Sequence, residues 1–417
     1  MKHKLIRILT FSVAISLCVS VSSQSQEKQK PRKFGWSLEQ QDKEKKGAEE
    51  NKDFRSTQDG KAVVTNLEAE TVRVETTLVV FEALVLTQDG SPIAGLKKED
   101  FEVFEEGQSQ EIGTFALGDG STVPRSIILI IDHSNSQLAY INDSVEAAKV
   151  LVDKLKPKDR MAVITDDVSL LVPFTQDKAQ LKNGLNSLKA KVAGGRYGKS
   201  LQLSALLATL QELVAEEERP IIVFQTDGDE VRSLKGIADA ANRAKQHRRN
   251  FGLEEIYREV EKGRATIYSI IPGPRLLSLS REEQMKNIEI ITLQEDEAWN
   301  QAKLRRGSFL RPSFSRKRSV KEYEMSLAIR LRQHEPLSSI SLLSGGAWAY
   351  LEKPSLAANI YAQIFTSIEQ RYILGYYPTN NLRDGKRRKV EIKIRNHPEY
   401  QTLGRKAYYN LERRKPK

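Results

Sequence analysis

Hydrophobic and polar positions divide the chain into three kinds of segment. Across residues 69–120, apolar residues alternate with polar ones in short runs separated by glycine turns, which is typical of antiparallel β-strands. Across residues 124–370, continuous apolar runs rich in β-branched residues alternate with segments in which apolar residues recur every three or four positions. This order of buried strands and amphipathic helices predicts an α/β domain with a doubly wound, Rossmann-like parallel sheet.

The alternating pattern returns in residues 371–417, most clearly in Arg388–Arg395. A β-rich segment on each side of the α/β domain predicts one β-sandwich formed from both, with the α/β domain inserted between its strands. Asp89, Asp100 and Glu105 of the N-terminal segment could be read as a calcium cluster. Ordinary turn chemistry explains these three residues more simply.

Within residues 124–370, the hydrophobic periodicity places the expected strands and helices. The expected strands are 126–131, 161–165, 170–174, 220–226 and 265–271. The expected helices are 138–156, 178–192, 200–217, 233–262 and 355–369. A short helix from residue 338 ends at Gly345-Gly346 and leads into a last strand that ends at Tyr350.

A charged stretch, residues 274–335, interrupts the alternation of strands and helices. Its basic residues form one run interleaved with Phe309 and Phe314. The basic residues of this run are Lys303, Arg305, Arg306, Arg311, Arg316, Lys317 and Arg318. Such a run can bind nucleic acid or an anionic surface, but we expect a flexible surface insertion.

Candidate chemistry lies at the ends of two of the expected strands. The apolar run 126–131 ends in Asp132, with hydroxyl groups two and four residues further on at Ser134 and Ser136. The second run, 220–226, is followed by Asp227. Parallel sheets bind ligands beyond the carboxyl ends of their strands, and hard oxygen ligands suit a small hard cation such as Mg²⁺.

The pattern Asp132-x-Ser134-x-Ser136 resembles the metal-ion-dependent adhesion site of von Willebrand factor type A domains. Thr226-Asp227-Gly228 is similar to the segment in which that family supplies its second carboxylate. The family's threonine ligand follows a Gly-Gly turn, whereas here Arg196–Lys199 intervenes and Ser200 is the expected stand-in. The adjacent Lys199 would place a positive charge near the cation and oppose it. A helix-capping serine with no metal is the alternative for Ser200.

Nearly the whole chain after residue 23 is similar to the VWFA-related family described from acidobacterial genomes. The segments that carry this similarity are Gly95–Gly107, the Asp132 site, Ser344–Gly346, Tyr372–Pro378 and Arg405–Tyr409. The resemblance implies a von Willebrand A fold in residues 124–370 and a Mg²⁺ or Mn²⁺ ion. It further implies that Ser134 and Ser136 bind the ion directly, while Asp132 and Asp227 hold it largely through water. An acidic side chain of a protein partner would complete the coordination.

Enzyme and nucleotide-binding motifs are missing from the sequence. Gly198-Lys199-Ser200 mimics the end of a P-loop, but Ala193 stands where the first glycine is required and no strand precedes it. The five histidines are scattered without a metal-binding spacing, and no Gly-x-Ser-x-Gly elbow occurs. The single cysteine excludes a cysteine-based zinc site. We therefore expect an interaction module rather than an enzyme.

The N-terminus predicts export. A short basic segment precedes the apolar stretch Ile8–Val21, and small residues follow, so residues 1–23 read as a secretory signal peptide. The chain would then be periplasmic or secreted, and a lipid anchor at Cys18 is disfavoured because Leu17 precedes it. The polar residues 24–68 are expected to be a disordered linker.

Length and charge leave a second function open. A chain of 417 residues holds two or more domains. The net charge of +11 permits contact with anionic surfaces, but no nucleic acid partner is expected. The alternative to a metal-dependent adhesion module is a metal-free structural or envelope-assembly scaffold that contacts anionic surfaces through the basic insertion. A hydrolase is a more distant possibility, and the sequence predicts no oligomeric state.

Overall fold

The computed structural model describes residues 33–40, 78–118, 124–214, 217, 220–236, 249–305 and 318–410. The chain divides into two units, Met1–Lys33 and Phe34–Lys417, and all described residues except Lys33 belong to the second. The predicted signal peptide and most of the predicted linker lie outside the described residues. Among the described helices, none has the length and apolarity needed to cross a membrane.

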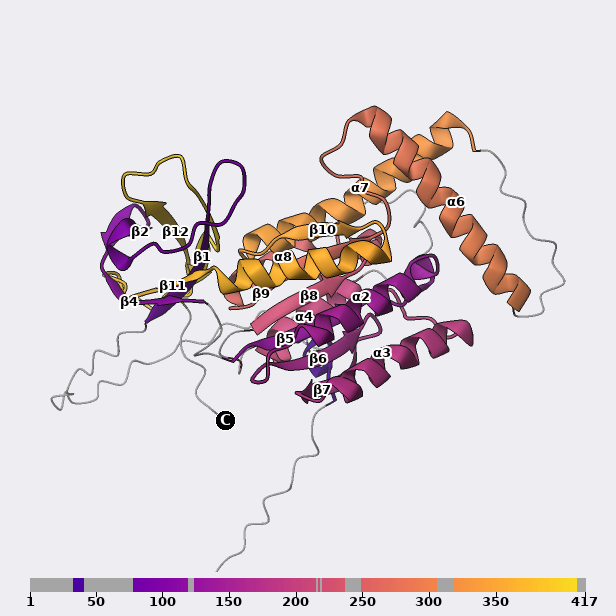
Figure 1. Cartoon of the computed structure of the whole chain (residues 1–417), viewed down its shortest axis with the longest axis horizontal. Coiled ribbons are helices and arrows are strands. Elements are labelled where there is room, and N and C mark those ends of the chain that lie inside the picture. Colours follow the sequence, from indigo (N-terminus) through magenta and orange to yellow (C-terminus); the bar gives the residue numbers. More distant parts are fainter. Residues whose placement is uncertain are drawn as a thin grey trace, which may run out of the picture. The chain divides into compact units, whose positions relative to one another are not determined.

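A six-stranded sheet forms the centre of the α/β domain (Figure 1). In sheet order, the strands are β10 (Trp348–Leu351), β9 (Thr266–Pro272), β8 (Pro220–Gln225), β5 (Ser126–Ile131), β6 (Arg160–Thr165) and β7 (Ser169–Thr175). All neighbours pair in parallel except β6 and β7, which are antiparallel at one edge. The sheet confirms the predicted doubly wound α/β fold.

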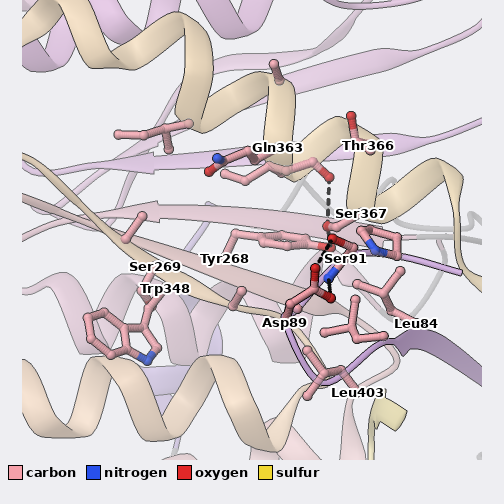
Figure 2. Close-up of a pocket in the computed structure, with 18 residues that line it drawn as sticks. Leu84, Asp89, Ser91, Tyr268, Ser269, Trp348, Gln363, Thr366, Ser367 and Leu403 are labelled. Carbon is pink, nitrogen blue, oxygen red and sulfur yellow. Dashed lines mark hydrogen bonds between the residues drawn. The ribbon is translucent and has the colours of Figure 1, made fainter. Parts of the chain in front are cut away.

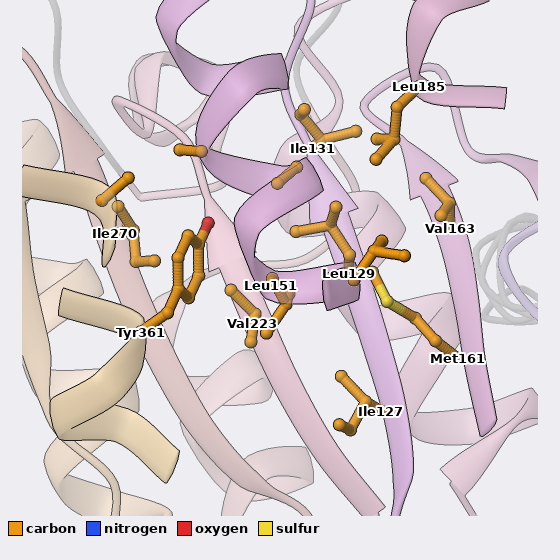
Figure 3. Close-up of a cluster of buried hydrophobic side chains, with 14 of the residues drawn as sticks. Ile127, Leu129, Ile131, Leu151, Met161, Val163, Leu185, Val223, Ile270 and Tyr361 are labelled. Atoms are coloured by element: carbon orange, nitrogen blue, oxygen red, sulfur yellow. The ribbon is translucent and has the colours of Figure 1, made fainter. Parts of the chain in front are cut away.

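Helices cover both faces of this sheet, which explains why its central strands are continuously apolar. One face packs against α2 (Ile141–Asp153), α3 (Lys178–Ala193) and α8 (Ala357–Glu369). Figure 3 shows Leu129 of β5 in this layer, with Leu151 of α2 and Tyr361 of α8 in the same cluster. The opposite face packs against α4 (Gln202–Glu212), α5 (Leu253–Lys262), α6 (Arg281–Arg305) and α7 (Val320–Leu343). Successive residues of β5 alternate between the two layers, as the pleat of a strand requires.

Two antiparallel sheets combine strands from both ends of the chain. Their orders are β13-β1-β11-β4 and β14-β12-β2-β3. The strands are β1 (Val79–Leu86), β2 (Phe101–Glu105), β3 (Gln108–Gln110), β4 (Ile112–Leu117), β11 (Tyr372–Tyr376), β12 (Arg387–Ile394), β13 (Gln401–Gly404) and β14 (Ala407–Tyr409). Phe81 pairs with Leu374 and Val103 with Ile392, and all four side chains join one buried core. The predicted sandwich built from both flanks is therefore the observed arrangement.

Asp89, Asp100 and Glu105 have separate structural roles and do not form a calcium cluster. Asp89 accepts a hydrogen bond from the Ser91 hydroxyl at 3.2 Å, and Asp100 accepts one from the Lys97 amide at 2.7 Å. Glu105 is buried and pairs with Arg388 at 3.1 Å. Turn chemistry accounts for the first two residues, whereas Glu105 belongs to an ion pair inside the sandwich.

The charged insertion differs from the flexible segment that we expected. Its described residues form the long helices α6 and α7, which lie against each other (Figure 1). Ile288 and Ile291 of α6, together with Tyr323 and Leu327 of α7, are buried in the core of the sheet's second face. Residues 306–317, which hold most of the predicted basic run, lie outside the described residues. A few apolar positions at helical spacing are enough to fix an otherwise polar helix.

Other differences concern the ends of helices. The helix expected at 200–217 spans Gln202–Glu212, and the one expected at 233–262 is described only as α5 from Leu253 onward. The short helix expected from residue 338 is the end of α7, which continues through Pro336. Within the predicted linker, residues 33–40 include a short helical stretch in which Ser37 bonds Glu212 of α4 at 2.8 Å.

Truncating the chain after Pro378 is expected to unfold the N-terminal β segment. The truncation removes β12, which pairs with β2, and β13, which pairs with β1. Hydrogen exchange in residues 79–117 should then approach the rate of an unfolded segment, while β5 stays protected. A chain that lacks only residues 411–417 is the control. Unchanged protection of β1 and β2 in the longer truncation would contradict this prediction.

Candidate metal centre

Three carboxylates meet at the carboxyl ends of β5 and β8. Asp132 follows β5 directly, and its amide donates to the carbonyl of Gln225, the last residue of β8. Asp227 lies two residues beyond β8, and Asp229 begins a short 3₁₀ helix, Asp229–Ser233. One oxygen from each of the three carboxyl groups lies within 4.8 Å of the others. Among the described residues, this is the group of His, Cys, Asp and Glu with the spacing of a metal site.

Asp132 is the most enclosed carboxylate of the group, with 2% of its surface exposed. It accepts hydrogen bonds from the Ser134 amide at 2.9 Å, the Thr226 hydroxyl at 2.8 Å and the Gln202 side-chain amide at 2.7 Å. Burial raises the pKa of Asp132 well above its usual value, and the negative charges of Asp166, Asp227 and Asp229 raise it further. A bound cation would relieve this cost of ionisation.

Ser134 and Ser136 lie side by side next to Asp132. Their hydroxyl oxygens are 3.0 Å apart, and Ser134 precedes a single 3₁₀ turn, Asn135–Gln137. Ser134 is buried and Ser136 is half-buried. The local chain therefore brings the two hydroxyls predicted as direct ligands to one point at the end of β5.

Ser200 is held by a carboxylate that the sequence analysis did not single out, Asp166. The fully buried Asp166 accepts a hydrogen bond from the Ser200 amide at 2.9 Å and one from the His133 amide at 3.0 Å. Gly198 passes so close that a Cβ atom there would lie 2.1 Å from the Asp166 carboxylate. Asp166 thus ties the loop before α4 to the Asp132 loop.

The Ser200 side chain turns toward the acidic group. Its hydroxyl hydrogen-bonds to Asp229, which connects the atypical loop to the three carboxylates. Ser200 itself adopts a positive φ of 55°, and the preceding Lys199 is exposed. The structure therefore brings Ser200 to the centre, while the opposing charge of Lys199 faces solvent.

Burial also raises the pKa of Asp229, to about 7, with a further contribution from the charge of Asp227. Hydrogen bonds from Gln202 and Ser200 lower it only in part. Gln202 donates to Asp229 at 2.6 Å with the same amide nitrogen that contacts Asp132. The amide of Gln202 therefore bridges two carboxylates that would otherwise repel each other directly.

Asp227 has a partner from the charged insertion. Arg330 of α7 donates to Asp227 at 2.9 Å and also pairs with Glu295 of α6. Although burial opposes the charged form, Glu295 and Asp227 raise the pKa of Arg330 above its usual value. A guanidinium thus already neutralises part of the acidic group.

The donor set fits a small divalent cation. Three carboxylates and the hydroxyls of Ser134, Ser136 and Ser200 are all hard oxygen donors, as Mg²⁺ and Mn²⁺ prefer. Burial, and after it the neighbouring carboxylates, raise the pKa values of Asp132 and Asp229, so ionising both groups without a cation is costly. Gln202, Thr226 and Arg330 satisfy part of that charge from within the protein.

Three cavities of about 490 to 540 Å³ among the described residues lie away from the candidate centre. One of about 530 Å³ is lined by residues that include Asp89, Ser91, Tyr268, Trp348 and Gln363 (Figure 2). Its lining includes none of the residues of the candidate centre, and within it Tyr268 bonds Ser367 at 2.9 Å. The candidate chemistry therefore rests on the acidic group and not on a deep pocket.

Comparisons with known proteins bear on this domain. A scan of family models matches residues 127–230 to the von Willebrand factor type A domain. A search of curated proteins finds no match. Among solved structures, the chain is similar to a von Willebrand factor type A protein from Catenulispora acidiphila, with 11% identity, 81% of this chain and 74% of that chain covered, and a TM-score of 0.33.

Two further solved structures match this chain with similar identities and TM-scores. The conserved hypothetical protein BatB from Bacteroides thetaiotaomicron is 17% identical, with 59% of this chain and 98% of that chain covered and a TM-score of 0.32. The manganese-loaded TRAP protein of Plasmodium vivax is 10% identical, with 73% of this chain and 97% of that chain covered and a TM-score of 0.31. The matched residues 127–230 contain the candidate centre from Asp132 to Asp229. Residues 127–230 of the chain thus match the model of the von Willebrand factor type A domain.

Proposed function

We propose that the protein is an exported interaction module that binds a partner protein through a divalent cation. The cation, Mg²⁺ or Mn²⁺, would be held by Asp132, Ser134, Ser136, Ser200 and Asp227, with Asp229 as a further carboxylate. The observation that carries this proposal is the convergence of three carboxylates with adjacent serine hydroxyls at one sheet edge. Type A domains are generally interaction modules rather than enzymes, and no catalytic role is proposed.

The chemistry of the interaction follows from the donors. A small divalent ion keeps open or water-filled positions when a protein supplies only part of its coordination. An acidic side chain of the partner can displace a water and bind the ion directly, so the cation bridges two carboxylates. Ser134 and Ser136 would bind the ion directly, and Asp166 would hold the Ser200 loop close to it.

Export is part of the proposal because of the predicted signal peptide at residues 1–23. The site of action would be the periplasm or the exterior of the cell. The partner is proposed to be a protein of the same compartment that presents an exposed aspartate or glutamate.

Calorimetric titration of residues 24–417 with Mg²⁺ and with Mn²⁺ tests the metal. We expect one site in the wild type and an affinity at least about tenfold lower in Asp132→Ala. Glu146→Gln is the control, because Glu146 is an exposed acid of the same domain that pairs with Lys149 and Lys189. Absence of binding in the wild type, or equal binding in Asp132→Ala, would remove the cation from the proposal.

A metal-free scaffold is the second candidate, and one observation favours it. Arg330 and the Gln202 amide already pair with carboxylates of the centre, so the acidic group has internal partners. In this function, the basic insertion would hold the protein to anionic envelope surfaces. Capture from envelope extract separates the two candidates: loss with EDTA supports the cation, whereas loss with salt alone supports the scaffold.

A further inference from the structure

The α6–α7 hairpin lies against the candidate centre at several points. Tyr140, just before α2, donates to Gln294 of α6 at 3.0 Å. Leu138 and Tyr197, from the loops of the centre, line a small cavity of about 100 Å³ together with Ala298 of α6. The insertion therefore packs on the same edge of the sheet as the three carboxylates.

Arg330 is the charged contact between this hairpin and the centre. Its side chain is only 16% exposed and lies between Asp227, at 2.9 Å, and Glu295 of α6. One of its two partners is the carboxylate assigned to the cation, and the other belongs to the insertion. The guanidinium and a divalent cation are both positive, so they compete for the negative charge of the Asp227 carboxylate.

We propose that Arg330 is a resident countercharge that competes with the divalent cation for Asp227 and thereby couples cation binding to the α6–α7 hairpin. This inference rests on the proposed function of the centre. With a cation bound, the negative charge of Asp227 would neutralise the ion, and Arg330 would keep Glu295 as its ionic partner. The guanidinium is never left buried without a carboxylate, so the exchange avoids the cost of an unpaired buried charge.

The coupling is reciprocal, as linked equilibria require. A cation weakens the contact between Arg330 and Asp227, and that contact weakens cation binding by the same factor. The insertion thus sets the affinity of the centre.

Two variants with opposite expected effects test the competition in the chain of residues 24–417. Arg330→Gln removes the competitor, and we expect Mg²⁺ to bind about five- to a hundredfold more tightly by calorimetric titration. Glu295→Gln leaves Asp227 as the carboxylate partner of Arg330 at the centre, and we expect weaker binding. Arg332→Gln, an exposed residue two positions further along α7, is the control for loss of one positive charge.

Each outcome decides between the two proposals. Tighter binding in Arg330→Gln, with weaker binding in Glu295→Gln and no change in Arg332→Gln, supports the competition. Equal or weaker binding in Arg330→Gln, while the wild type binds, overturns the competition and leaves the cation site in place. If Arg330→Gln does not fold, unchanged binding in Glu295→Gln overturns it instead. Absence of binding in the wild type and in both variants overturns the cation site itself, and the competition with it.

Discussion

Replacing Asp159 by alanine is expected to lower the free energy of unfolding by about 3–5 kcal/mol, measured by urea denaturation. Asp159 is the main partner of Arg125, which begins the segment leading into β5 and is fully buried. The carboxylate accepts from the Arg125 Nε at 3.0 Å and from the Lys156 amide at 2.8 Å. Without it, the guanidinium stays buried with Glu369 at 3.4 Å as its ionic partner.

A double variant and an exposed pair serve as controls for this result. Arg125→Met with Asp159→Leu removes both charges, so it should recover a large part of the lost stability. Asp153→Ala breaks an exposed ion pair, in which the side chain of Asp153 is 59% exposed and that of Lys182 is 36% exposed. This substitution should lower the free energy of unfolding by less than about 1 kcal/mol. If Asp159→Ala lowered the free energy of unfolding no more than Asp153→Ala does, the buried pair of Arg125 and Asp159 would not stabilise the fold as we expect.

The central strand and its polar end were predictable because their signals are local. An apolar run that is buried on both faces and followed by Asp132 and Ser134 predicts a parallel strand whose carboxyl end lies at a ligand site. The structure places β5 in the middle of the sheet and Asp132 in one group with Asp227. Whether these residues bind a cation stays a prediction until it is measured.

The remaining parts of the centre depend on contacts between distant segments. Arg330 lies 103 positions from Asp227, and nothing in the sequence around either residue indicates their pairing. Asp166 follows β6 and reaches Ser200 across 34 positions. The sequence gives only a weak indication that Asp229 belongs to the centre. Asp229 stands two residues after Asp227, just as Ser134 stands two residues after Asp132.

The sequence does not predict the two long helices of the insertion, for a physical reason. Most residues of α6 and α7 are polar, so the apolar stripe that predicts a helix is narrow. The few buried positions, such as Ile288 and Leu327, are enough because they meet an existing core. Tertiary packing fixes these helices more than their own periodicity does.

The Asp229→Asn variant should make the metal-free protein more stable at neutral and alkaline pH while weakening cation binding. Burial and the charge of Asp227 raise the pKa of Asp229 from 3.8 to about 7, so the folded state favours its protonated form. The metal-free wild type therefore loses stability as the pH rises from about 4 to about 7, because the buried carboxyl must ionise. Asparagine keeps the shape and cannot ionise.

In EDTA, the stability advantage of Asp229→Asn over the wild type is expected to grow by about 3 kcal/mol between about pH 4.5 and about pH 8. Added Mg²⁺ should make the wild type more stable than Asp229→Asn at about pH 8, because the ionised Asp229 then has a cation as its partner. Urea unfolding in four conditions, with and without Mg²⁺ at both pH values, measures the effect. A constant difference between variant and wild type across pH would show that folding does not raise the pKa of Asp229, and it would contradict this prediction.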